Sequence, residues 1–135
     1  MILVDTSVII GFLKGDQNSK TELMNEILSR EIPFGISCYT YQEVLQGARN
    51  EGEFQTLKDY LSSQRIYHLK VEAETYEKAA RLYYDLRRGG ITPRSTLDML
   101  IALTAMENQL VLLHNDQDFD AMAEKIPELR ILNSL

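Results

Sequence analysis

The chain has 135 residues, 44% of them hydrophobic and 25% charged, which is typical of a soluble globular protein and predicts one domain, residues 1–135, with a core of its own. The formal net charge of −6 argues against a protein that binds nucleic acid by electrostatic attraction alone, but not against a nuclease whose clustered carboxylates hold a cation. The single cysteine, Cys38, excludes an internal disulfide and a cysteine zinc site, and with no signal peptide or long apolar stretch it indicates a cytoplasmic protein without a membrane span.

The N-terminal residues 1–5 (MILVD) indicate a buried strand, because a short apolar run is followed at once by the helix-capping sequence DTS. The next segment, VIIGFLKG, predicts a short helix that ends near Gly15. Apolar residues at helical spacing predict a second helix at about residues 18–31, and Pro33 marks its end.

The middle of the chain predicts two more strands and two more helices. The apolar runs IPFGIS (residues 32–37) and RIYHL (residues 65–69) are the strands, and helices at about 39–49 and 53–63 lie between them.

The C-terminal half continues the alternation of helices and strands. A long helix at about 72–88 is stopped by two glycines, and a second helix at about 96–109 is apolar on nearly every side, which indicates a central position. Strand LVLLH, helix DFDAMAEKI and strand RIL follow. This alternation predicts an α/β fold with a parallel central sheet of four to five strands, flanked by helices and joined by right-handed crossovers.

Four acidic residues stand in apolar segments: Asp5 in MILVD, Glu43 in YQEVLQGA, Asp98 in STLDMLIAL and Asp116 after VLLH. A carboxylate in such a segment is costly to bury unless a cation or hydrogen-bond donors compensate it. Asp5 and Asp116 directly follow strands, and ligands of open α/β sheets bind beyond the carboxyl ends of the strands. Asp98 and Glu43, each near the start of a helix, can reach the same edge.

Each acid also has an ordinary structural explanation. Asp5 and Asp116 can cap helices, Asp98 follows Ser95 at capping-box spacing, and Glu43 can pair with Arg49. The joint pattern favours a shared site, because carboxylates within about 5 Å repel by roughly 3 kcal/mol per pair and require a counter-charge. Oxygen ligands alone point to Mg²⁺ or Mn²⁺.

The basic residues are unevenly spread, and four arginines crowd one stretch: Arg81, Arg87, Arg88 and Arg94. The pattern is typical of a solvated helix face. Few lysines or arginines stand in the runs around the four acids, so the sequence offers no obvious basic side chain as their counter-charge.

The motifs DTSVI, EVLQGA, STLDMLIA and LLHNDQDF, in this order along essentially the whole chain, resemble those of PIN-domain ribonucleases, and most closely the VapC-type toxins. The resemblance implies that Asp5, Glu43, Asp98 and Asp116 form a catalytic and metal-binding quartet. It further implies that Asp118 is an auxiliary metal ligand and that Thr6 supports the site. Many relatives have threonine at the position of His114, which we expect beside the metal site as a supporting residue.

The resemblance also implies an activity and its partners. The chain is expected to be a Mg²⁺- or Mn²⁺-dependent endoribonuclease that hydrolyses RNA to a 5′-phosphate and a free 3′-hydroxyl, acting as the toxin of a type II toxin–antitoxin pair. It implies a homodimer and a cognate antitoxin that covers the site, in a groove we place near Phe12, Leu23 and Leu57.

Two alternatives remain open from the sequence. One is a metal-independent ribonuclease that uses His68 and His114, the only histidines, as acid and base. The other is a non-catalytic interaction module, in which the acids serve only as helix caps and ion-pair partners.

Overall fold

The computed structural model describes all 135 residues and confirms the predicted α/β fold. Five strands alternate with seven helices, in the order β1 (Ile2–Val4), α1 (Thr6–Lys14), α2 (Ser19–Ser29), β2 (Phe34–Ser37), α3 (Cys38–Gln46), α4 (Glu51–Ser62), β3 (Arg65–Tyr67), α5 (Ala73–Arg88), α6 (Thr96–Glu107), β4 (Val111–Leu113), α7 (Gln117–Lys125) and β5 (Arg130–Ile131).

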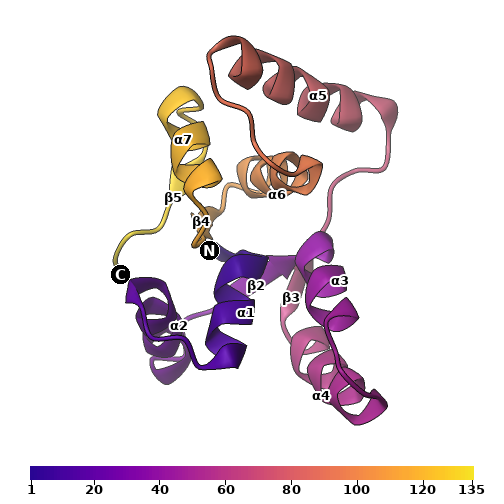
Figure 1. Cartoon of the computed structure of the whole chain (residues 1–135), viewed down its shortest axis with the longest axis vertical. Helices are drawn as coiled ribbons and strands as arrows, with labels where there is room; N and C mark the ends of the chain where they lie inside the picture. Colours follow the sequence, from indigo (N-terminus) through magenta and orange to yellow (C-terminus); the bar gives the residue numbers. More distant parts are fainter.

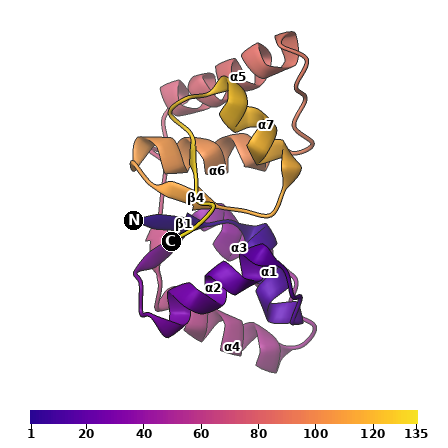
Figure 2. The ribbon, with the colours of Figure 1, turned by 90° about the vertical axis from the view of Figure 1, so that its left-hand side faces the viewer.

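The five strands form one parallel sheet in the order β3-β2-β1-β4-β5. The N-terminal strand β1 is central, and the chain winds outward from it on both sides (Figure 1). Figure 2 shows three layers, with α5, α6 and α7 on one face of the sheet and α1, α2 and α4 on the other. Because every strand runs the same way, the residues that follow β1, β2 and β4 gather at one edge.

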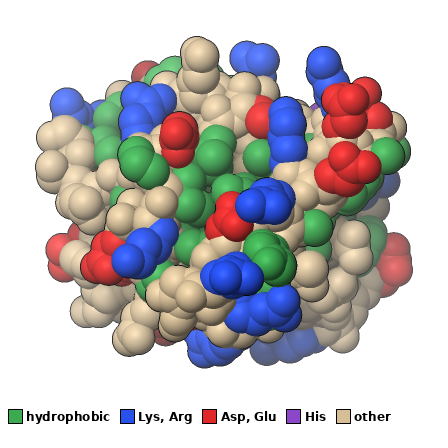
Figure 3. Space-filling view, turned by 90° about the horizontal axis from the view of Figure 1, so that it is seen from above, with side chains coloured by type: hydrophobic (Ala, Val, Ile, Leu, Met, Phe, Trp, Pro, Cys, Tyr) green, Lys and Arg blue, Asp and Glu red, His purple; other side chains and the backbone are tan.

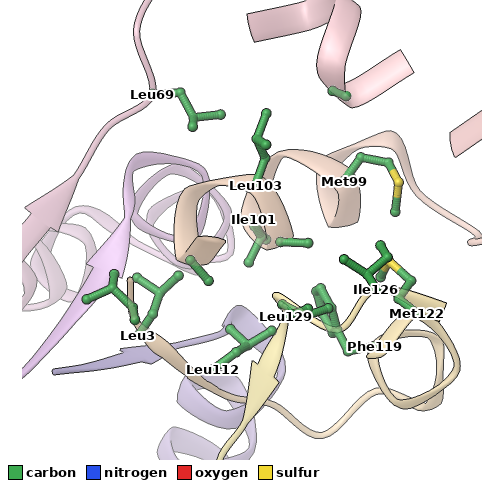
Figure 4. Close-up of a cluster of buried hydrophobic side chains, with 14 of the residues drawn as sticks. Leu3, Leu69, Met99, Ile101, Leu103, Leu112, Phe119, Met122, Ile126 and Leu129 are labelled. Carbon is green, nitrogen blue, oxygen red and sulfur yellow. The ribbon is translucent and has the colours of Figure 1, made fainter. Parts of the chain in front are cut away.

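The core has two parts, one on each face of the sheet. The cluster under α5, α6 and α7 contains 16 buried residues, and Figure 4 shows that they come from α6, β4 and α7 among others, for example Ile101, Leu112 and Phe119. The cluster on the other face contains 11 buried residues from β1, β2, β4 and helices α1–α4. Helix α6 is confirmed as central, since six of its residues are buried: Met99, Ile101, Ala102, Leu103, Thr104 and Ala105.

The observed element ends differ from the predicted ones by a few residues, each for a local reason. Helix α4 begins two residues earlier than predicted, because the Asn50 side chain accepts a hydrogen bond from the Glu53 backbone N–H. Strand β2 begins at Phe34, two residues later than predicted. Glu31 adopts a left-handed conformation (φ 53°), and the Ile32 N–H donates a hydrogen bond to Ile27 O, so Ile32 is still hydrogen-bonded to the end of α2. None of the seven helices has the length and apolarity that crossing a membrane demands.

Candidate metal centre

Asp5 enters the site from the end of the central strand. It is the N-cap of α1, and its Oδ2 accepts hydrogen bonds from the Ser7 backbone N–H (3.1 Å) and the Ser7 hydroxyl (2.6 Å). The Ser7 hydroxyl in turn accepts from the Asn115 backbone N–H (2.9 Å), which ties the loop after β4 to the end of β1. Only 5% of Asp5 is exposed, and burial raises its pKa although the Ser7 hydrogen bonds oppose the shift.

Glu43 reaches the same edge from α3 and is held by hydroxyl groups rather than by arginine. The Thr6 hydroxyl lies 2.8 Å from Glu43 Oε1 and 3.0 Å from the Thr40 hydroxyl, which lies 3.3 Å from that of Ser37. An ionised carboxylate can only accept hydrogen bonds, so Thr6 donates its single hydroxyl proton to Glu43. Thr6 Oγ1 then accepts from the Thr40 hydroxyl, and Thr40 Oγ1 accepts from the Ser37 hydroxyl.

The alternative partner of Glu43, Arg49, pairs with Glu53 instead, at 3.2 Å. The predicted supporting residue Thr6 is the side chain that donates a hydrogen bond to Glu43.

Asp98 lies in the first turn of α6, and its pKa, like that of Asp5, is raised. The Ser95 hydroxyl accepts from the Leu97 backbone N–H, so α6 is capped by Ser95 and not by Asp98. Burial, followed by the charges of Asp116 and Asp5, raises the pKa of Asp98 to about 7. Asp118 and Glu43 add to this effect, and no donor or cation offsets it. The charges of the other four acids therefore all act on Asp98.

Asp116 and Asp118 complete the cluster at the start of α7. Asp116 is the N-cap of α7 and accepts from the Asp118 backbone N–H at 2.9 Å. One carboxylate oxygen from each of Asp98, Asp116 and Asp118 lies within 4.8 Å of the other two. Three such oxygens close together provide the hard donors that Mg²⁺ or Mn²⁺ takes in proteins.

His114 stands behind this cluster rather than beside it. The ring is 1% exposed and packs on Phe119, with 5.1 Å between the ring centroids. Its Nδ1 accepts from the Asp116 backbone N–H at 3.0 Å, which places the proton of the neutral ring on Nε2. Nε2 lies 3.2 Å from Asp120 Oδ1 but at a poor angle for a hydrogen bond. Burial lowers the pKa of His114, so the ring is neutral and orients the Asp116 backbone.

Arg94 is a site residue that the sequence did not single out. It lies in the loop between α5 and α6, not on the solvated helix face predicted for the four arginines. Its Nη2 lies 3.0 Å from Asp116 Oδ1 and its Nε 3.3 Å from Asp118 Oδ2. The one available signal was its position, since Arg94 is the only basic residue between Gly90 and Asp98.

Known proteins resemble this chain in sequence along most of its length. The family model described as the PIN domain matches residues 2–125. Over 125 residues the chain is 31% identical to a VapC ribonuclease of Mycobacterium bovis and to ribonuclease VapC11 of Mycobacterium tuberculosis, covering 91% of this chain and 92% of each relative.

Solved structures with the same fold include VapBC complexes. VapBC2 from Rickettsia felis, bound to a promoter DNA fragment, superposes with a TM-score of 0.72 at 21% identity over 100% of both chains. DNA-bound VapBC from Salmonella typhimurium gives a TM-score of 0.70 at 25% identity, covering 97% of this chain and 96% of that one.

Proposed function

This chain belongs to the PIN domain family, and from that membership we propose that it is a divalent-metal-dependent endoribonuclease, the toxin of a type II toxin–antitoxin pair that acts in the cytoplasm. The observation that carries the proposal is the convergence of carboxylates at the sheet edge, where Asp98, Asp116 and Asp118 offer oxygens within 4.8 Å of one another. We assign residues 1–135 as one nuclease domain, because β5, beyond the family match, completes the same sheet.

The residues present fit a Mg²⁺ or Mn²⁺ ion. Asp5, Asp98 and Asp116 would hold it, with Asp118 as an additional ligand, and the pKa of about 7 for Asp98 indicates a carboxylate that lacks its counter-charge. When bound, such an ion stabilises negative charge on a phosphodiester and makes water more acidic.

Glu43 is the residue we assign to orient the attacking water. The Thr6 hydroxyl fixes Glu43 Oε1 at 2.8 Å and leaves the other carboxylate oxygen to accept a proton from water. The water oxygen bonds to phosphorus and the bond from phosphorus to the 3′ oxygen breaks. The 3′ oxygen takes a proton from solvent water and Glu43 returns its proton to solvent, so the products are a 5′-phosphate and a 3′-hydroxyl.

The substrate that we propose is RNA. A groove of ≈ 620 Å³ between α5 and α6 is lined by aromatic, aliphatic and basic side chains that include Tyr83, Tyr84, Arg87 and Arg94. Figure 3 shows the face above α5, where basic and acidic side chains surround a hydrophobic area. Aromatic rings and arginines together favour single-stranded nucleic acid, because bases stack on the rings and phosphates pair with the guanidinium groups.

The antitoxin that we propose binds on the other side of the acids. A groove of ≈ 660 Å³ between α1, α3 and α4 contains Glu43 beside Ile10, Val44 and Leu57. A groove that carries both apolar and charged side chains suits an amphipathic segment of an inhibitor. Of the positions expected from the sequence, Leu57 lines this groove, whereas Phe12 and Leu23 are half-buried and pack against the 11-residue cluster. A homodimer is part of the same proposal.

The test is RNA cleavage by the purified protein with Mn²⁺ or with excess EDTA. We expect a 5′-phosphate product with metal and none in EDTA, and we expect Asp5→Asn and Asp98→Asn each to abolish cleavage. Asp59→Asn is the matched control, because Asp59 is exposed on α4 and bonds only to Gln55.

Two other outcomes would support the alternatives. Cleavage that persists in EDTA and leaves a 2′,3′-cyclic phosphate would favour a histidine mechanism. The geometry is against it, since His114 is buried and the strands that precede His68 and His114 are three spacings apart in the sheet, roughly 14 Å. Neither cleavage nor a rise in melting temperature with Mn²⁺ would favour a non-catalytic interaction module.

A further inference from the structure

The guanidinium of Arg94 contacts two carboxylates of the acidic cluster. It bridges two carboxylates that arise 22 and 24 residues further along the chain, with Nη2 on Asp116 and Nε on Asp118. These are two of the three acids whose oxygens lie within 4.8 Å of one another. The positive charge of Arg94 therefore lies against two of the carboxylates that would bind the metal.

We propose that Arg94 is the resting counter-ion of this site and that a divalent metal must displace its guanidinium in order to bind. The inference rests on the proposed metal-dependent function and adds a determinant of metal affinity. Arg94 then sets the metal concentration at which the site loads, and it keeps the metal-free acids from repelling one another.

Charge and distance make the two cations compete. A metal–oxygen contact is about 2 Å long and the Arg94–Asp116 contact is 3.0 Å. An ion on Asp116 would therefore lie within roughly 5 Å of the guanidinium, where a single and a double positive charge repel strongly. Both cations also draw on the same two carboxylates, so neither keeps its full complement of partners when the other is present.

Exposure makes displacement possible. The Arg94 side chain is 77% exposed, whereas those of Asp116 and Asp118 are 24% and 21% exposed. The guanidinium can swing into solvent without disturbing any packed side chain. The Arg94 backbone N–H also donates to Asp118 Oδ2 at 3.0 Å, and this hydrogen bond does not depend on the side chain. The loop therefore stays attached to the site when the guanidinium leaves.

The test compares Arg94→Gln with Arg30→Gln. Both substitutions remove one exposed positive charge, and Arg30 pairs with Glu26 on α2, apart from the acids. Mn²⁺ affinity is measured by isothermal titration calorimetry, and melting temperature is measured in EDTA and in saturating Mn²⁺. We expect Arg94→Gln to bind Mn²⁺ on the order of tenfold more tightly than the unmodified protein and Arg30→Gln to leave the affinity unchanged.

Stability gives a second readout that does not require activity. In EDTA, Arg94→Gln leaves Asp116 and Asp118 without a cation, so we expect a lower melting temperature than for the unmodified protein. In saturating Mn²⁺ this difference should disappear. NMR of the Arg94 Nε–H should show protection from solvent exchange in the metal-free protein and loss of that protection when Mg²⁺ is added.

The outcomes separate this inference from the proposed function. If the unmodified protein binds Mn²⁺ but Arg94→Gln binds it equally or less tightly, Arg94 is not a competitor and only the inference fails. If the Nε–H stays protected at saturating Mg²⁺, the guanidinium is not displaced and the inference fails as well. If the unmodified protein binds no divalent metal at all, both the proposed metal site and the role of Arg94 are wrong.

Discussion

Burial and the neighbouring acidic charges both act on the Asp98 carboxyl group. Its pKa of about 7 lies above the ordinary value of 3.8, so the folded protein holds a proton there that the unfolded chain has lost. Stability from this group is complete below about pH 4 and is lost as the pH rises toward 7. A bound cation removes this loss because it favours the ionised form.

This predicts how Asp98→Asn depends on pH. In EDTA the variant should gain stability relative to the unmodified protein as the pH rises from about 5 to about 8, because asparagine cannot ionise. Thermal unfolding of both proteins across this range gives the difference. His114, whose lowered pKa acts in the opposite direction, is common to both and largely cancels. A difference that does not change with pH would mean that Asp98 is ionised throughout.

Thr6 is the hydroxyl that couples Glu43 to the buried donors Thr40 and Ser37. Thr6→Val keeps the shape of the side chain but leaves the Thr40 hydroxyl without an acceptor and Glu43 without a donor. We expect a loss of about 1–3 kcal/mol in the free energy of unfolding. We expect a fall of roughly 10- to 100-fold in RNA cleavage, the range seen when the partner of a metal-site residue is removed.

The matched control for this change is Thr6→Ser, which retains the hydroxyl and should retain most of the activity. Chemical denaturation and single-turnover cleavage distinguish the two variants. Equal activity of the valine and serine variants would show that the hydrogen bond to Glu43 has no part in catalysis.

Strands β2 and β3 meet at a glycine that has no room for a side chain. A Cβ on Gly35 would lie 2.4 Å from the Tyr67 ring and 2.8 Å from Arg65 O, and Gly35 pairs with Arg65 in the sheet. Gly35→Ala must therefore shift the ring or separate the strands. We expect a cost of about 1–3 kcal/mol in the free energy of unfolding.

Gly52→Ala is the matched control and should raise the free energy of unfolding, whereas Gly35→Ala should lower it. Gly52 is exposed in α4, where a Cβ meets only the Asn50 side chain at 3.4 Å. Alanine should stabilise this helix by about 0.5–1 kcal/mol. Urea denaturation of both variants gives the comparison, and a Gly35→Ala protein as stable as the original would mean that Tyr67 moves aside freely.

The sequence predicts elements well where local signals decide them. The capping sequence after β1 and the glycines after α5 mark helix ends that neighbouring residues alone determine. Asp5 and Asp116 were placed at one sheet edge for a similarly general reason, because parallel strands share that edge.

Contacts between segments far apart in the sequence could not be predicted in this way. Arg94 meets Asp116 and Asp118 only because the loop before α6 passes over the start of α7. His114 is buried because α7 brings Phe119 against its ring. Neither spacing nor composition encodes these paths, which depend on how helices pack over the sheet.

The two core clusters share the central strands, and this links the two faces of the molecule. In β1, Leu3 belongs to the 16-residue cluster while Ile2 and Val4 belong to the 11-residue cluster, and in β4 Leu112 and Leu113 divide in the same way. The acids divide in the same way. Asp5 caps α1 and Glu43 lies in α3, on one side of the sheet. Asp98 lies in α6 and Asp116 caps α7, on the other side. The fold should therefore unfold as one unit.

Met122→Ala tests this cooperativity. Met122 is fully buried in α7, within the 16-residue cluster, and its truncation should cost about 2–5 kcal/mol. If the molecule is one cooperative unit, hydrogen exchange of the buried α2 amides around Ile27, on the opposite face, should accelerate by the same free energy as exchange in α7. Glu124→Ala, on the exposed side of α7, should change neither by more than about 0.5 kcal/mol. Faster exchange in α7 with unchanged exchange in α2 would show that the layers open separately. Mn²⁺ would then be expected to couple them, because its proposed ligands come from both layers.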